Sequence, residues 1–358
     1  MDEAVSRTTA ATRPRWPRSV LVIALISAAL AIWYRFGHGL TVDEPFMVNK
    51  AGLGWSALKE VFPVDNLPFA YVTLKLWITA FGESEFAVRM PSVLAFAAAV
   101  AMTGAAGARL GGAGIGIAAA GLVAASDQIG LEHAATARPY ALLAAVSAAA
   151  LLQSLPLVGL ADGERGSRLP RAAVLAVTHL AGLFTHPTYV VVAMACAAAS
   201  VVAERRLRSP ALLAPIVSVG IYALVWGPTV RATIALQTTS WMHSPTLLDV
   251  QRGVMLLWGV GPGFMLAGAL VAVMISNPRR TRDVLGDRRV TWVLTGAVGA
   301  WALAVGISMA KPIFEATRTP MMLLPFTSLA LATVLGRLGG SRAASHSPSS
   351  ARSPLATA

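Results

Sequence analysis

Two adjacent carboxylates, Asp43 and Glu44, follow the first apolar stretch of the chain, which runs from Ser19 to Phe36. That stretch is long enough to cross a bilayer. The basic segment 13–18 precedes it, so the carboxylates are predicted to emerge on the side away from the cytoplasm. Acids held where lipid meets water favour a site that acts on something presented by the membrane.

Other residues able to do chemistry fall on the same predicted side. The residue types leave two interpretations open for the leading candidates. Asp43 suits a helix N-cap before Pro45 as well as it suits a catalytic base. Arg138 could extend from a helix start toward the interface, or bind phosphate with its fork of N–H groups. His186 fits a hydrogen-bonded turn. The full set of candidates is Asp43, Glu44, Asp65, Arg138, Tyr140, His186, Lys311 and Arg318.

Composition indicates the kind of scaffold that carries these residues. Of 358 residues, 56% are apolar and 13% are charged, whereas soluble domains average about 25% charged. The chain is therefore predicted to be an all-α, polytopic membrane bundle. A single cysteine, Cys196, excludes a disulfide framework and a cysteine-rich metal site.

The distribution of charge predicts the topology. Ten spans with both termini cytoplasmic place 19 basic and 7 acidic residues inside, and ten of each outside, so the whole net charge of +12 is cytoplasmic. This bias is typical of membrane topology, and it argues against a nucleic-acid partner. The predicted location is the inner (plasma) membrane. The expected spans are 19–36, 91–108, 113–131, 140–159, 172–185, 188–203, 211–230, 254–275, 290–310 and 320–337.

The chain divides into three predicted parts. Residues 1–18 and 339–358 read as disordered cytoplasmic ends that flank a transmembrane domain over 19–338, with a long first outer loop at 37–90. Within that loop, apolar residues of 69–78 recur at helical spacing, interrupted by Lys75, which predicts an amphipathic helix at the outer interface. The glycines of 112–116 do not form a nucleotide-binding register and instead predict close packing of two helices.

Several motifs occur in an order that resembles a known group of proteins. They are Asp43-Glu44, Asp65-Asn66-Leu67-Pro68, Phe81-Gly82 through Pro91-Ser92, Arg138-Pro139-Tyr140, Phe184-Thr185-His186, and Arg318 through Pro325. Together, over residues 20–335, they resemble the GT-C superfamily of integral-membrane glycosyltransferases. The nearest branch is the bacterial one related to protein O-mannosyltransferases and the lipid A aminoarabinose transferase. Two positions depart from the family pattern: Asn66 stands where His is frequent, and Thr319 where Tyr is common.

The resemblance implies a GT-C-like fold and a mannosyltransferase-like hexosyl or pentosyl transferase. Its donor would be a polyprenyl-phosphate-linked monosaccharide, and its acceptor an envelope glycan, lipid or protein. Asp43 would be the base and Glu44 its orienting or acceptor-binding neighbour, with Arg138 as the leading phosphate ligand. Weaker substrate-binding candidates are Asp65, Tyr140, His186, Lys311 and Arg318.

Two alternatives belong to other functional classes: a carrier or flippase for a lipid-linked sugar, and a catalytically inactive membrane partner. No cofactor is indicated with certainty, and no metal-ligand motif occurs, although a divalent cation stays an open alternative.

Overall fold

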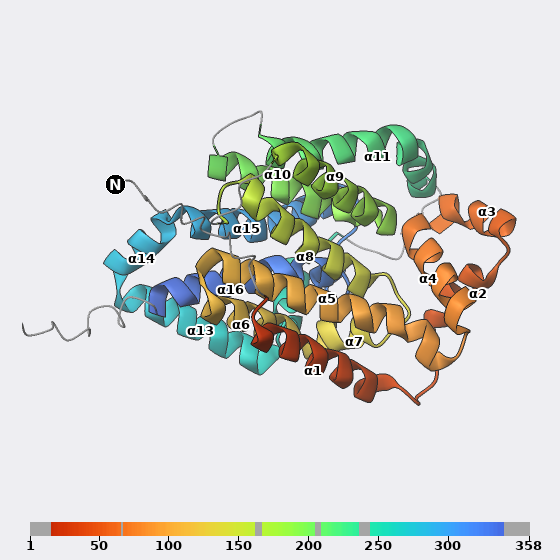
Figure 1. Cartoon of the computed structure of the whole chain (residues 1–358), viewed down its shortest axis with the longest axis horizontal. Coiled ribbons are helices and arrows are strands. Elements are labelled where there is room, and N and C mark those ends of the chain that lie inside the picture. Colours follow the sequence, from red (N-terminus) through yellow and green to blue (C-terminus); the bar gives the residue numbers. More distant parts are fainter. Residues whose placement is uncertain (1–15, 66, 162–166, 205–208, 236–243, 340–358) are drawn as a thin grey trace, which may run out of the picture.

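The computed structural model describes residues 16–65, 67–161, 167–204, 209–235 and 244–339, and every regular element within these ranges is a helix. The all-α class is therefore confirmed for this part of the chain. Residues 1–15, Asn66 and 340–358 lie outside it, and so do the predictions made for them. Most helices run along the long axis of the molecule, while α2, α3 and α4 gather at one end (Figure 1). The helices are α1 (Arg18–Arg35), α2 (Glu44–Gly52), α3 (Trp55–Asp65), α4 (Pro68–Phe81), α5 (Glu85–Gly111), α6 (Ala113–Ala124), η1 (Asp127–Leu131), α7 (Glu132–Ala134), α8 (Tyr140–Leu157), α9 (Arg168–Thr185), η2 (Pro187–Tyr189), α10 (Val190–Glu204), α11 (Pro210–Ala235), α12 (Leu247–Leu256), α13 (Val260–Ser276), α14 (Pro278–Gly286), α15 (Arg288–Ala310) and α16 (Thr319–Gly339).

The long helices are apolar enough for a multi-pass membrane protein. Within the described ranges, seven of them have the length and hydropathy to cross a bilayer, and an eighth span results if α6 and the segment Gln128–Ala134, bent by 60°, count as one. The expected span at 172–185 lies within α9, whereas the expected span at 254–275 is broken between the end of α12 and α13. Neither α9 nor α13 meets these criteria, because α9 has two arginines among its first four residues and α13 has 17 residues. The structure thus supports several spans without establishing ten.

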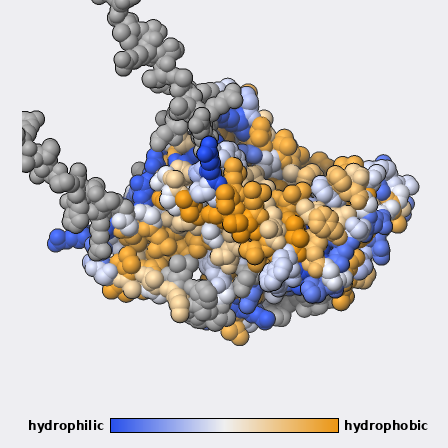
Figure 2. All heavy atoms as spheres, turned by 60° about the horizontal axis from the view of Figure 1, so that its bottom comes forward, coloured by the Kyte–Doolittle hydropathy of each residue, from blue (hydrophilic) through white to orange (hydrophobic). Residues whose placement is uncertain are grey.

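The surface and the core are both apolar, as expected for a bundle in lipid. On the face drawn in Figure 2, hydrophobic residues cover much of the middle of the body. Large side chains such as Leu25 and Leu224 are 70% and 83% exposed. In the interior, α16 packs against α5, α6, α8 and α15. Its middle turns belong to the main core of the bundle, where Phe326 and Leu329 are buried.

Small residues bring α5 and α6 close together. A Cβ atom on Gly116 would lie 2.7 Å from the carbonyl oxygen of Gly104, and one on Gly107 would lie 2.9 Å from that of Ile115. No side chain fits at such distances, so glycine permits the contact. The prediction that the glycines of 112–116 serve helix packing is confirmed for Gly116, whereas a Cβ atom on Gly112 or Gly114 would have no neighbour within 4 Å.

Arginines cap helix ends at the end of the molecule that holds α14, opposite to α2–α4 (Figure 1). Arg288 donates from Nε to the carbonyl of Ala203 and from Nη2 to that of Val158, both at 2.8 Å. Arg289 Nη1 donates to the carbonyl of Leu110 at 2.9 Å. These cations satisfy the C-terminal carbonyls of α10, α8 and α5, where the helix dipole is negative.

Helices α2, α3 and α4 form a small unit with its own core, which includes Leu58, Tyr71 and Leu74. The helix expected over 69–78 is confirmed as α4, and Gly82 ends it with φ of 83°. A lysine that interrupts an apolar pattern implies a solvent-facing side chain, but Lys75 does not face solvent. It is buried, and its ammonium donates to the carbonyls of Ala51 and Leu53, which caps α2.

Candidate functional site

Five segments that are distant in sequence meet around one cavity of about 490 Å³, between the α2–α4 unit and the ends of the long helices. They are the ends of α2 and α3 with α4, the turn before α8, the α9–η2 junction, the last turns of α11, and the α15–α16 connection. The cavity wall is largely apolar, with side chains such as Leu143 and Met322. Six predicted site residues line it: Asp65, Arg138, Tyr140, His186, Lys311 and Arg318.

Asp43 lies beside this cavity and contacts two of its cations. Its Oδ2 is 3.5 Å from Arg138 Nη1 and 3.4 Å from Arg318 Nη2, and its side chain is 46% exposed. Both distances exceed those of strong charge-assisted hydrogen bonds, so the carboxylate keeps room for another partner. Asp43 occupies the N-cap position of α2, yet its side chain makes no capping hydrogen bond. Between the two interpretations of Asp43, the geometry supports the one in which its carboxylate faces a site.

The ring of Tyr140 lies near both arginines. The guanidinium carbons of Arg138 and Arg318 lie 5.5 Å and 6.0 Å from its centroid, and Arg138 Nη2 donates to Tyr140 Oη at 3.3 Å. Burial acts to lower the pKa of Arg138, but Tyr140 and Asp43 outweigh it and raise that pKa above the ordinary value. Glu315 Oε2 accepts from Arg318 Nε at 2.9 Å. Hydrogen bonds and ion pairs thus hold both guanidinium groups in place, as phosphate recognition requires.

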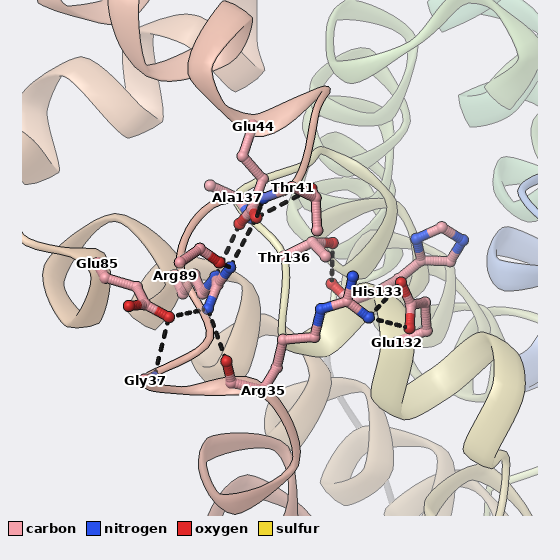
Figure 3. Close-up of polar contacts among 11 residues, drawn as sticks. Arg35, Gly37, Thr41, Glu44, Glu85, Arg89, Glu132, His133, Thr136 and Ala137 are labelled. Atoms are coloured by element: carbon pink, nitrogen blue, oxygen red, sulfur yellow. Dashed lines mark hydrogen bonds and ion pairs between the residues drawn. The ribbon is translucent and has the colours of Figure 1, made fainter.

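Glu44 is fully buried and is not one of the residues that line the cavity. Figure 3 shows its carboxylate bonded to Arg89, Thr41 and Ala137. Arg89 of α5 donates to both oxygens of the Glu44 carboxylate, from Nε to Oε1 and from Nη2 to Oε2, at 2.8 Å each. The backbone N–H groups of Thr41 and Ala137 add hydrogen bonds of 2.7 Å each. Burial would raise the pKa of Glu44, but these donors outweigh it and keep that pKa below the ordinary value, so the carboxylate is ionised.

These bonds relate Glu44 directly to the site. Glu44 adjoins Asp43 in the chain, and Ala137, which donates to Glu44, adjoins Arg138. One buried carboxylate therefore fixes both the predicted base and the leading cation, which meet at 3.5 Å. Of the two roles expected for Glu44, its geometry supports orientation and gives no access to an acceptor.

A second polar group lines the cavity on the side of the α2–α4 unit. Asp65 Oδ2 accepts from Lys50 Nζ at 2.5 Å and from the hydroxyl of Tyr71. Burial raises the pKa of Tyr71 well above its ordinary value, and the Asp65 carboxylate adds to this effect, so the phenol stays protonated and donates.

His186 lines the cavity beside the arginines as a neutral side chain. The backbone N–H of Thr188 donates to its Nδ1 at 3.3 Å, and the Thr188 hydroxyl lies 2.7 Å from the same atom. Burial, together with the positive charges of Arg138 and Arg318, lowers the pKa of His186 to about 4. Since Nδ1 accepts, the proton resides on Nε2. The turn interpretation of His186 and its place in the cavity wall both hold.

The list of predicted site residues omits three that matter. Arg89 belongs to a recognised motif, but its buried pairing with Glu44 needed the structure. His133 supports Tyr140 from behind, with ring centroids 4.6 Å apart and Nε2 2.8 Å from the carbonyl of Thr317. Lys50 follows Phe46 by four residues, which places both on one face of α2. This spacing is the sequence signal that could have identified Lys50 as a site residue.

The acids at the site do not form a metal centre. Asp43, Asp65 and Glu315 each contact a cationic side chain, and the described part of the chain has no group of three or more His, Cys, Asp or Glu side chains able to hold an ion.

Comparison with models of known protein families and with curated proteins found no match for this chain. What the molecule does must therefore be inferred from the site itself.

Proposed function

We propose that this chain is a GT-C-like membrane glycosyltransferase that moves a monosaccharide from a polyprenyl-phosphate donor to an envelope acceptor hydroxyl. The observation that carries the proposal is the position of Asp43. An accessible carboxylate lies within 3.5 Å of two arginines beside a cavity at one end of an apolar helix bundle. A base next to phosphate-binding cations is what transfer from a sugar phosphodiester needs.

The reaction follows from these positions. The acceptor hydroxyl oxygen attacks the anomeric carbon, its proton passes to Asp43, and the bond from that carbon to the phosphate oxygen breaks. The polyprenyl phosphate leaves with the bonding pair and needs no proton. Arg138 and Arg318 neutralise the charge it gains. Donor phosphate would also draw these cations from Asp43, which frees the carboxylate to accept the proton.

The proposal includes the arrangement in the membrane. The site lies at the end opposite to the arginines that cap α5, α8 and α10. We place those arginines in the cytoplasm, and the cavity on the outer face of the inner membrane, with ten spans and both termini inside. The largely apolar wall of the cavity then suits a polyprenyl tail that enters from the lipid.

Release of polyprenyl phosphate tests the proposal, because every donor sugar gives this product. Purified protein in lipid nanodiscs is given short-chain polyprenyl-phosphate hexoses and pentoses together with envelope extract as acceptor. We expect one donor to be consumed, with transfer reduced about 10²- to 10⁴-fold in Asp43→Asn, which keeps the size of the side chain but loses its basicity. Donor binding without release would indicate a carrier instead. Equal rates for Asp43→Asn and the parent would exclude Asp43 as the base.

A further inference from the structure

The cavity has two polar regions of different charge. Apart from Lys50 and Asp65, the charged residues that the structure describes in the cavity wall and beside it at Asp43 are three cations (Arg138, Lys311 and Arg318) and two carboxylates (Asp43 and Glu315). On the side of the α2–α4 unit, Lys50 and Asp65 carry opposite charges that cancel. An anionic group is attracted to the first region, whereas the second attracts neither sign.

The balanced region nevertheless offers hydrogen bonds. An ammonium has three donor positions, and a carboxylate has about four acceptor sites, so the 2.5 Å bond between Lys50 and Asp65 leaves capacity on both. Their side chains are 33% and 20% exposed, and both line the cavity. Tyr71, only 2% exposed, donates to Asp65 from the core of the α2–α4 unit and positions that carboxylate.

An aromatic ring completes this wall. Phe46 lines the cavity, is 61% exposed, and precedes Lys50 by one helical turn on the same face of α2. Donors and acceptors whose charges balance, beside an aromatic surface, suit a ligand that carries hydroxyl groups on an otherwise apolar ring.

We propose that Lys50 and Asp65 form a subsite for the hydroxyl groups of a sugar ring, separate from the cationic phosphate region. Phe46 packs against the ring, and Tyr71 is a positioning residue. The inference rests on the proposed function and extends it, because it names the residues that select the sugar. The ring belongs either to the donor or to an acceptor glycan, and both present the same chemistry.

A purely structural role is the competing account, since the Lys50–Asp65 pair also joins α2 to the end of α3. Three variants separate the two accounts: Lys50→Met, Asp65→Asn, and Lys59→Met as a control. Lys59 is an exposed lysine of α3 that does not line the cavity. Thermal unfolding in detergent shows whether each variant is folded.

Binding is then measured with two lipid probes, polyprenyl phosphate and the same lipid carrying a sugar. We expect Lys50→Met and Asp65→Asn to bind polyprenyl phosphate as the parent does, and to bind or turn over the sugar-linked lipid about 10- to 100-fold less well, as lost charge-assisted hydrogen bonds predict. The ratio of the rates for lipids that carry epimeric sugars should also move towards one in these two variants. If the lipid-linked sugar binds normally without acceptor but transfer is lost, the subsite holds the acceptor ring.

Free methyl glycosides provide an arm that needs neither lipid nor transfer. Saturation-transfer NMR on the parent and on Lys59→Met should detect a glycoside, and the signal should disappear in Lys50→Met and Asp65→Asn. If the folded variants lose binding of polyprenyl phosphate and of the sugar-linked lipid equally, the subsite is overturned. It is also overturned if both variants still bind the glycoside. A third outcome is that no lipid-linked sugar is a substrate, while the parent binds a glycoside and Lys50→Met does not. That outcome would refute the proposed transfer and leave the sugar subsite supported.

Discussion

Glu44 and Arg89, 45 residues apart, form an ion pair in which both side chains are fully buried, with Nη2 and Oε2 at 2.8 Å. Glu44 comes from the start of α2 and Arg89 from the first turns of α5. Arg89 also reaches the carbonyls of Arg35 and Gly39 at 2.9 Å and 2.6 Å. The pair therefore ties the end of α1, the start of α2 and α5 into one support beneath Asp43.

Breaking this pair should destabilise the protein. Arg89→Met leaves a buried carboxylate without its counter-ion, which typically costs about 3–5 kcal/mol. Glu44→Gln should be milder, because the amide oxygen still accepts one hydrogen bond. The double variant should lose less than the sum of the single ones, as contacting partners do. Thermal unfolding in detergent checks this, and simple additivity would contradict a direct Glu44–Arg89 coupling.

Replacement of Glu44 should also separate support from chemistry. Glu44→Gln is expected to lose less transfer activity than Asp43→Asn, since Glu44 only fixes the position of its neighbour. Rates of polyprenyl phosphate release from folded protein measure the difference. A larger loss in Glu44→Gln, at parental stability, would mean that Glu44 takes part in the reaction.

Arg138→Gln should weaken donor binding by about 10- to 100-fold, the usual effect of losing hydrogen bonds to a charged group. Acceptor affinity should change little, because only the donor carries the phosphate in our scheme. Arg35→Gln is the matched control: Arg35 pairs with Glu132 at 2.7 Å near the same end of the bundle but does not line the cavity. Donor titrations of both variants decide this, and equal affinities would remove Arg138 from the site.

His186 should make stability dependent on pH below neutrality. Its pKa is lowered from 6.5 to about 4 in the folded chain, so the unfolded chain binds more protons between these values. Stability therefore falls as pH drops from about 6.5 towards 4. In His186→Gln, whose amide can still accept from Thr188, this decline should be smaller. Unfolding midpoints at several pH values test it, and parallel curves for variant and parent would contradict a His186 that is neutral in the folded chain.

Cysteine labelling tests the sidedness of the bundle. The native Cys196 is buried, so it should react little. Glu60→Cys on α3 and Asp283→Cys on α14 add exposed thiols at opposite ends of the molecule (Figure 1). A membrane-impermeant maleimide applied to intact spheroplasts should label the first variant and not the second. The reverse pattern would place the cavity in the cytoplasm.

The sequence by itself determined the helical class and the approximate position of the apolar helices, because each long helix has to be apolar along its own length. It also identified the candidates Asp65, Arg138, Tyr140, His186, Lys311 and Arg318, which line one cavity. Their residue types and order were enough for this, since polar side chains in so apolar a chain cluster at helix ends.

Only the tertiary structure decided how these residues divide their tasks. Asp43 and Glu44 are adjacent in sequence, yet one is 46% exposed beside Arg318 and the other is fully buried against Arg89. Arg318, which contacts Asp43, is 275 residues away from it in the sequence, and Ala137, which donates to Glu44, is 93 residues away from it. Local pattern carries no information about such distant contacts, because they arise only when α16, α5 and the turn before α8 pack together.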